Sequence, residues 1–292
     1  MPQRLTAGAT RKAQRLLWSV AMNNGLLTQI RILDTDSIRP FEWEDSTPSG
    51  PTPSADDIHL VRNPFPVLSL GDDSYLLLEE APLFRLLGDS GLPHVPAQVY
   101  AAEDVRLAAE RMALVDFHYD DLVNLIARHT DHMAIVDRPG SPPPGFIEVV
   151  FEFTSGRTAP VQLRHSTRTG CADALDSLFR AIHSRGKYMP VVEHPAARDV
   201  VIKTISPSGF VDLPIFTLDD LRTAALSDRL FPPGLIRPLT SYRVVSIDFP
   251  ISVLRSDISS DQKESFLKEL IIFREQSRRT AFYEGRIYIL NL

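Results

Sequence analysis

The chain has 292 residues, a formal net charge of -6 and a hydrophobic share of 43%. That length allows one large domain or two smaller ones with a sizeable core. The mildly acidic balance argues against a dedicated binder of nucleic-acid phosphates, which carries a basic face. The single cysteine, Cys171, excludes an intrachain disulfide framework and any site built from several cysteines. No apolar run approaches the roughly 20 residues of a membrane-spanning helix, so we expect a cytoplasmic protein without a membrane partner.

Residues 1–29 are predicted to be a basic N-terminal extension, since they contain several Arg and Lys and no acid. Ala9–Met22 has the apolar spacing of an amphipathic helix. It fits either a basic arm or a helix packed on the domain surface. Residues 46–54, with the sequence STPSGPTPS, are expected to be a flexible loop because Pro, Ser and Gly cannot build a core there.

A strand–turn–helix pattern follows at Tyr75–Gly91. The apolar run Leu76–Leu78 predicts a buried strand, Glu79–Pro82 a turn, and Leu83–Gly88 a short helix. Many folds bind phosphate at such a turn, because the first N–H groups of the helix are unpaired and its dipole is positive there. This turn, however, contains two glutamates and a proline.

The rest of the chain mixes strands and helices without regular alternation, which indicates an α+β fold with a small mixed sheet. The longest helical pattern is Glu103–His129, with a break near His118–Asp120. The Pro- and Gly-rich stretch Asp137–Gly145 is the best domain boundary. Further strands are expected at Ile30–Leu33, Phe65–Leu70, Gly91–Tyr100, Ile147–Phe153, Val200–Ile205, Ser241–Ile247 and Gly285–Leu290, and further helices at Cys171–Arg185, Thr217–Leu226 and Asp261–Arg278.

Two groups of acidic residues are candidates for chemistry. Acids and imidazoles gather between Asp116 and His132, but their spacing matches no specific metal motif, so we expect no metal site. Glu42 lies between Phe41 and Trp43, where partial desolvation would raise its pKa and suit it to general-base work. The competing interpretation of Glu42 is an ordinary acid on a surface loop.

The order of these pieces resembles the ParB/sulfiredoxin-like superfamily, and more closely its SbnI-type free L-serine kinase and regulator family of siderophore clusters. The motifs that carry the resemblance are Ile32-x-x-x-Asp36-Ser37-Ile38-x-x-x-Glu42, Arg62-Asn63-Pro64, Gly91-x-x-His94-Val95-Pro96-Ala97-Gln98, Phe231-Pro232-Pro233-Gly234-Leu235-Ile236-Arg237 and Tyr242-Arg243-Val244-Val245-Ser246-Ile247. The resemblance is good over residues 30–105 and 228–292 and poor between them.

This resemblance implies a ParB/sulfiredoxin-like domain over residues 30–136 and a C-terminal α+β domain over residues 146–292. It implies that Glu42 is the base for a serine hydroxyl, and that the product is O-phospho-L-serine, a precursor of 2,3-diaminopropionate. The cofactor of an active member would be ATP or ADP with Mg. The candidate cofactor-binding residues are Arg62, Asn63, Glu79, Glu80, Arg85 and Gln98.

The chain departs from the family at the strand–helix turn, where the family has D-G-x-H-R. The corresponding residues here are Glu79-Glu80-Ala81-Pro82-Leu83. Glu80 places a carboxylate where the family has a glycine that lets the backbone approach phosphate, and Leu83 removes a guanidinium. Arg85 lies one turn later and is the candidate to compensate.

Three functions therefore stay open at the level of the sequence. The first is a divergent binding or regulatory protein of a siderophore or diaminopropionate-type pathway, without the standard nucleotide phosphate loop. The second is an active kinase for free serine or a similar small hydroxyl substrate, with Glu42 as base. The third, a DNA-binding regulator, is disfavoured by the charge of -6. The expected partners are an amino acid or a nucleotide, and a homodimer is left open.

Overall fold

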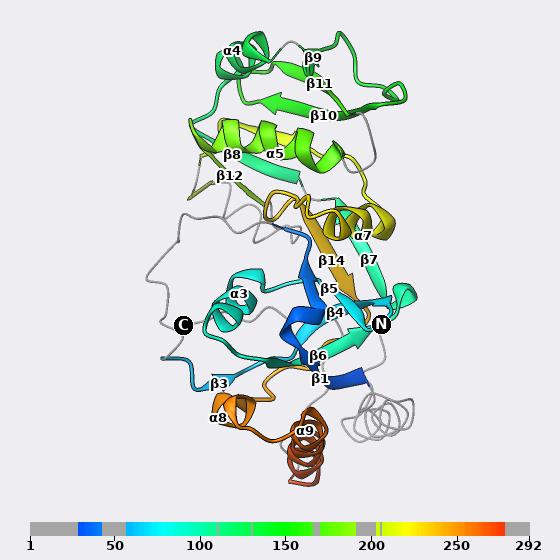
Figure 1. The fold of residues 1–292 in the computed structure, drawn as a ribbon. Helices are drawn as coiled ribbons and strands as arrows, with labels where there is room; N and C mark the ends of the chain where they lie inside the picture. Colours follow the sequence, from blue (N-terminus) through cyan, green and yellow to red (C-terminus); the bar gives the residue numbers. More distant parts are fainter. Residues whose placement is uncertain are drawn as a thin grey trace, which may run out of the picture.

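The computed structural model describes residues 29–42, 57–109, 111–129, 131–165, 170–190, 203–204 and 206–277. The fold is α+β, as expected, with a five-stranded sheet, a six-stranded sheet and two strand pairs (Figure 1). The predicted N-terminal extension before residue 29, the loop at 46–54 and the strand at Gly285–Leu290 lie outside the described residues. So does most of the predicted strand Val200–Ile205, whose two described residues, 203 and 204, are helical.

The five-stranded sheet forms the lower half of the molecule in Figure 1. Its order is β1 (Ile30–Asp34), β6 (His94–Tyr100), β4 (Phe65–Gly71), β5 (Ser74–Leu77) and β2 (Ile38–Pro40). The pairs β1–β6 and β4–β5 are antiparallel, whereas β4–β6 and β2–β5 are parallel. The β4–β5 hairpin turns at Asp72 and Asp73, both with positive φ.

Both faces of this sheet are buried, because successive side chains of a strand point to opposite sides. On β5, Tyr75 and Leu77 belong to one apolar core, while Leu76 and the following Leu78 belong to another. The continuous apolar run that marks this strand in the sequence is therefore explained by burial on two sides.

The six-stranded sheet lies in the upper half and is antiparallel throughout. Its order is β12 (Lys187–Pro190), β8 (Arg111–Val115), β13 (Gly209–Asp212), β10 (Phe146–Phe153), β11 (Thr158–Arg164) and β9 (Met133–Ile135). Helix α5 (Gly170–His183) packs on it, with Leu175, Leu178, Phe179 and Ile182 fully buried, as the sequence pattern predicts.

The long helix predicted at Glu103–His129 is wrong in its first half. After the short 3-10 turn η3 (Ala102–Asp104), the chain forms strands β7 (Val105–Ala109) and β8, and only then helix α4 (Tyr119–Arg128). β7 pairs with β14 (Ile236–Thr240), and β8 pairs with β12 and β13. Pairing with strands from distant parts of the chain thus overrides a local helical spacing.

The strand predicted at Ser241–Ile247 is also absent, since residues 241–248 are irregular up to β15 (Phe249–Pro250). Ser246 and Asp248 have φ values of 58° and 43°, in the left-handed region that a strand does not use. The predicted helix α7 (Leu218–Leu226) is confirmed. It begins with a capping box between Thr217 and Asp220.

The C-terminal helices return to the five-stranded sheet. Helices α8 (Ile251–Arg255) and α9 (Ser260–Gln276) follow β15, which pairs with β3 (Leu60–Val61). Their side chains Ile251, Leu254 and Leu267 share one core with β1, β4 and β6. The domain boundary at residues 137–145 stays a prediction. Each core contains segments from both sides of it. Helix α9 packs on the N-terminal sheet, while β8 and α4 belong to the core of the six-stranded sheet.

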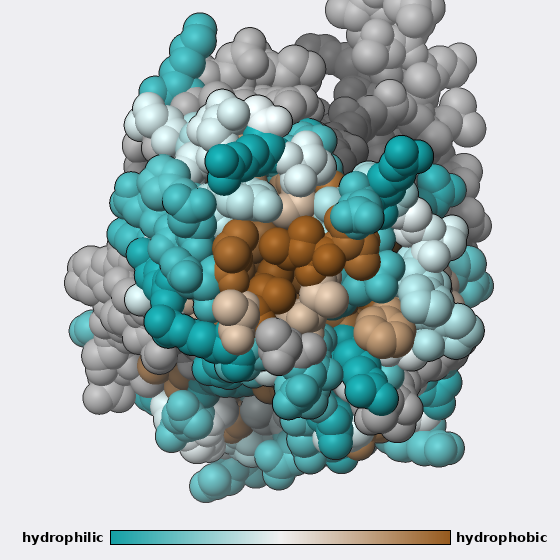
Figure 2. Space-filling view, turned by 90° about the horizontal axis from the view of Figure 1, so that it is seen from above, coloured by the Kyte–Doolittle hydropathy of each residue, from teal (hydrophilic) through white to brown (hydrophobic). Residues whose placement is uncertain are grey.

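The end of the molecule that carries α4 and β9 has an apolar patch ringed by hydrophilic residues, which Figure 2 shows from above. Val123 of α4 and Ile135 of β9 are large apolar side chains exposed on these elements. In the described ranges, no helix combines the length and the apolar character needed to cross a bilayer.

Candidate functional site

Glu42 and Glu79, two of the candidate residues, follow neighbouring strands at the end of the five-stranded sheet. Because β2 and β5 are parallel and paired from Ile38↔Tyr75 to Pro40↔Leu77, their carboxyl ends lie side by side. Glu42 follows β2 by two residues and Glu79 follows β5 by two residues. Polar groups at the carboxyl ends of neighbouring parallel strands are typical of a binding site in mixed sheets.

Glu42 is held in place by the loop that the sequence resemblance singled out. Its Oε1 accepts a hydrogen bond of 3.1 Å from the Gly234 N–H. The backbone of Glu42 forms an isolated parallel bridge with Phe231, whose N–H donates to the carbonyl of Phe41 at 2.8 Å. The Arg85 guanidinium donates to the carbonyl oxygen of Glu42 at 3.4 Å. Residues 192 positions apart in the chain thus meet at the carboxylate.

Helix α3 (Ala81–Asp89) begins beside this carboxylate, which confirms the strand–turn–helix predicted at this place. Its N-cap residue, Glu80, has φ 66° and ψ 32°, a left-handed conformation that costs a non-glycine residue about 1 kcal/mol or more. The Glu80 side chain makes no capping hydrogen bond to the helix, and Pro82 occupies the first turn. Leu83 is the third residue of the helix. The strained cap is therefore occupied by an acid.

Arg243 pairs with both acids of this turn. Its guanidinium donates to Glu80 Oε1 at 2.7 Å and forms a second ion pair with the Glu79 carboxylate. Arg243 comes from the irregular segment 241–248, 164 residues from Glu79 in the chain. The sequence motif that contains Arg243 drew attention to it, but no local signal could assign its partners. We call Glu79, Glu80 and Arg243 the Arg243 cluster.

Burial sets the electrostatics of the cluster. The pKa of the Glu80 carboxyl is raised, first because burial penalises its charge, and further by the neighbouring Glu79. The positive charge of Arg243 and hydrogen bonds from Arg243 and Asn63 act in the opposite direction. Burial and the charge of Glu79 together therefore outweigh the effects of Arg243 and Asn63 on the pKa of Glu80.

Asn63 and Gln98 bind the segment that carries Arg243. The Asn63 side-chain oxygen accepts from the Ser246 N–H, and the Gln98 side-chain oxygen accepts from the Val244 N–H, both at 2.9 Å. Gln98 is fully buried, and its Nε2 has no hydrogen-bond partner among the described residues. Arg62 is exposed and contributes its carbonyl, which accepts from the Asp248 N–H at 3.1 Å.

Two tyrosines close the site on the side of β6. The Tyr100 hydroxyl donates to the carbonyl of Tyr242 at 2.7 Å, and the two rings lie 5.9 Å apart. Burial raises the pKa of both phenols. They are hence neutral hydrogen-bonding groups that fix the backbone next to Arg243.

The acids and imidazoles between Asp116 and His132 have structural contacts instead. The Asp121 carboxylate accepts from the His118 N–H at 2.9 Å at the start of α4 and pairs with Arg185, while Asp120 pairs with Arg157. Within the described ranges, no three His, Cys, Asp or Glu side chains gather in an arrangement suited to a metal ion.

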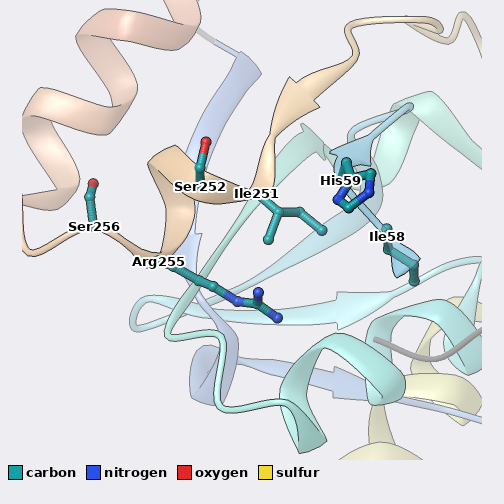
Figure 3. A pocket seen from close by; sticks show the side chains of 6 residues that line it. All are labelled: Ile58, His59, Ile251, Ser252, Arg255 and Ser256. Atoms are coloured by element: carbon teal, nitrogen blue, oxygen red, sulfur yellow. The ribbon is translucent and has the colours of Figure 1, made fainter. Parts of the chain in front are cut away.

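A pocket of about 480 Å³ lies elsewhere in the lower half, between α8 and the residues that precede β3. Figure 3 shows Ile251 and Arg255 on one side and Ile58 and His59 on the other. None of the candidate residues predicted from the sequence lines it.

Solved structures share this fold. SbnI with a C-terminal truncation, from Staphylococcus aureus, matches with a TM-score of 0.67 and 12% identity over 86% of this chain and 99% of that one. A free serine kinase in complex with AMP matches with a TM-score of 0.56 and 13% identity over 77% of this chain and 93% of that one. No family model and no curated protein matches the chain.

The chain has the fold of SbnI and free serine kinase. A variant of the kinase in complex with ADP gives the same TM-score, 0.56, and 13% identity. At this level of identity the likeness concerns the arrangement of the backbone. It shows a structural relation to that family. The chemistry of the site has to be argued from the residues that this chain has there.

Proposed function

We propose that the protein is a divergent relative of the serine-kinase family, with a ParB/sulfiredoxin-like sheet, that binds a small molecule as a regulatory protein and does not transfer phosphate. The observation that carries the proposal is the Arg243 cluster at the start of α3. A turn that would receive phosphate through N–H groups and cations instead has two carboxylates and an arginine already paired with both.

The energetic argument concerns lost donors. A charge-assisted hydrogen bond contributes about 1.5–3 kcal/mol. Compared with the family pattern, Pro82 lacks an N–H group and Leu83 lacks a guanidinium. Glu80 adds a negative charge that repels phosphate. The sequence suggested Arg85 as the residue that compensates for the missing guanidinium. In the structure, its guanidinium donates to the carbonyl oxygen of Glu42.

Calorimetry tests this proposal. ADP and ATP, each with and without magnesium, are titrated into the full chain. We expect no binding in the micromolar range. A free serine kinase known in complex with ADP serves as the positive control. Micromolar binding of either nucleotide to this chain would overturn the proposal.

The second candidate is an active kinase for free L-serine or a similar small hydroxyl substrate, and the placement of Glu42 favours it. A carboxylate fixed by the Gly234 N–H at 3.1 Å is oriented as a general base requires. In that case Glu42 takes the hydroxyl proton, ATP or ADP with Mg supplies the phosphoryl group, and the product is O-phospho-L-serine.

Phosphorus NMR separates the two candidates. The chain is incubated with ATP or ADP, magnesium and free serine, and the spectrum is followed for a phosphomonoester signal. A signal that disappears in Glu42→Gln establishes the kinase. Absence of product with serine and with other hydroxyl amino acids leaves the binding protein.

The biological setting that we propose is a siderophore or diaminopropionate-type pathway in the cytoplasm. The ligand of the binding protein would be an amino acid, whereas the alternative, an active kinase, would bind a nucleotide as well. Genes for such a pathway next to the coding sequence would support it. A homodimer is tested by light scattering. A salt-dependent gel shift tests DNA binding, which the net charge of -6 disfavours.

A further inference from the structure

The Arg243 cluster is unbalanced in charge. One guanidinium faces two carboxylates in a site where the side chains of Arg243, Glu79 and Glu80 are 27%, 37% and 28% exposed. Neighbouring carboxylates repel each other, and Glu79 contributes to the raised pKa of Glu80. The two carboxylates therefore share the single positive charge of Arg243.

Two buried donors beside the cluster have no acceptor among the described residues: Arg243 Nε and Gln98 Nε2. They belong to one place, because the Gln98 oxygen binds the N–H of Val244, the residue next to Arg243. A fully buried amide with an unused N–H is costly. Both unused atoms are donors, and they come from different elements, β6 and the segment 241–248. A ligand that satisfies them offers acceptor oxygens.

The helix itself adds a third feature. α3 is nine residues long, and its N-terminus, with the partial positive charge of the helix dipole, lies at Glu80 and Ala81. A cation, two unused donors and a helix N-terminus together favour an anion with several oxygens, such as a phosphate group. Glu79 and Glu80 now occupy the place of that anion.

We propose that Glu79 and Glu80 are an internal competitor for anions: they hold Arg243 in a closed site, and a phosphate-bearing ligand binds at the start of α3 once both carboxylates are neutralised. This inference rests on the proposed function, because it names what keeps the unmodified chain from binding nucleotide. It assigns part of the loss to electrostatic occupation of the site, in addition to the donors that Pro82 and Leu83 do not supply.

The test is a gain of binding. In the double variant Glu79→Gln/Glu80→Gln, the side chains keep their size while Arg243 loses both charged partners. We expect the dissociation constant for ADP, measured by calorimetry, to fall at least tenfold relative to the unmodified chain. Inorganic phosphate as a second probe reports whether the phosphate alone accounts for the gain.

Two further variants make the result specific. Adding Arg243→Met to the double variant removes the gained binding if Arg243 is the receiving cation. Glu152→Gln breaks the Arg111–Glu152 ion pair on the six-stranded sheet and serves as the matched control, with no gain expected. A gain that survives Arg243→Met, or that appears equally in Glu152→Gln, overturns the inference.

The two proposals fail in different ways. Micromolar binding of ADP by the unmodified chain overturns the proposed function. An unmodified chain and a folded double variant that are equally unable to bind ADP overturn only the internal competitor. Circular dichroism checks the fold of the double variant. If that variant does not fold, the single variants Glu79→Gln and Glu80→Gln are measured instead. The inference is contradicted if neither of them binds ADP more tightly than the unmodified chain.

Discussion

Glu80 combines two unfavourable features, a left-handed backbone and a buried charge, at a position where glycine is the relaxed choice. Strain kept at a ligand-facing turn is typical of functional sites. Arg243, by its charge and hydrogen bond, and Asn63, by a hydrogen bond, offset part of the free energy lost by burying the Glu80 carboxylate. We therefore expect the charged Glu80 side chain to lower the stability of the fold.

Replacement of Glu80 by Gln should stabilise the protein at neutral pH. The pKa of Glu80 is raised in the folded chain, so the folded state holds this proton more tightly than the unfolded one. That contribution is complete below the unfolded pKa, near 4.5, and is lost as the pH rises through the raised value. We therefore expect Glu80→Gln to have a higher Tm than the unmodified chain at pH 7.5 and a smaller difference near pH 4.5.

Thermal unfolding by circular dichroism measures this difference at the two pH values. Glu152→Gln, which removes the carboxylate of an ion pair distant in the fold, is the control for the general effect of one lost charge. The opposite result would be a Tm difference between Glu80→Gln and the unmodified chain that is less favourable to the variant at pH 7.5 than at pH 4.5. It would show that the attraction of Arg243 outweighs the effect of burial on Glu80.

At the scale of elements, α9 is fastened to the five-stranded sheet by a buried lysine. Lys263 is 1% exposed, and its ammonium donates to the Leu254 carbonyl at 2.7 Å and lies 3.3 Å from His94 Nδ1. The other ring nitrogen of His94 lies 3.1 Å from the Asp34 carboxylate. This arrangement requires a neutral ring that accepts from Lys263 and donates to Asp34.

Acidification should weaken this attachment. Burial, and then the charge of Lys263, lower the pKa of His94 below 6.5, while Asp34 acts in the opposite direction. Since the folded chain resists a proton that the unfolded chain takes up, stability falls as the pH drops below 6.5. We expect His94→Gln to flatten this dependence, and Lys263→Met to raise the pKa of His94 in an NMR titration. If the pKa of His94 is the same in Lys263→Met as in the unmodified chain, the contact between Lys263 and His94 is contradicted.

A glycine fixes the passage from α5 to β12. A Cβ added to Gly186 would lie 2.5 Å from the Val115 carbonyl oxygen and 3.0 Å from that of Asp116. Since both obstacles are backbone atoms, one in the last residue of β8 and one in the residue after it, Gly186→Ala should lower the free energy of unfolding by about 1–3 kcal/mol. Gly140→Ala, with nothing within 4 Å, is the matched control and should change it by about 0.5 kcal/mol or less. Equal effects in urea denaturation would show that β8 and Gly186 are not in close contact.

At the scale of the whole molecule, one core depends on residues from both ends of the described chain. Leu267 of α9 is fully buried against the N-terminal sheet, whereas Phe273 of the same helix is 61% exposed. Leu267→Ala should therefore cost about 2–5 kcal/mol of unfolding free energy, and Phe273→Ala about 0.5 kcal/mol or less. Hydrogen exchange of β1 and β6 tests whether the loss reaches the sheet, and unchanged exchange in Leu267→Ala would show that α9 is not part of this core.

What the sequence predicts well is local. The strand, turn and helix within Tyr75–Gly91 and the helices α5 and α7 follow from local patterns, and the structure confirms each of these elements, although α3 begins two residues earlier than predicted. The partners of Arg243 are a different case, because nothing within one turn of it carries the signal.

The errors have the same cause. Residues 103–115 have a helical spacing that is overruled by pairing of β7 with β14 and of β8 with β12 and β13. Tertiary context decides between helix and strand where apolar residues are frequent. Position along the chain is therefore a poor guide to which residues share a site in this fold.

The return of α8 and α9 to the first sheet makes the upper half of the molecule an insertion within the lower one. During synthesis the N-terminal strands leave the ribosome first. Their apolar face stays uncovered until Leu254 and Leu267 have been made, which happens only after the whole upper half. At ~5–20 residues per second this wait is on the order of ten seconds. The nascent chain consequently offers chaperones an uncovered sheet until α8 and α9 have been made.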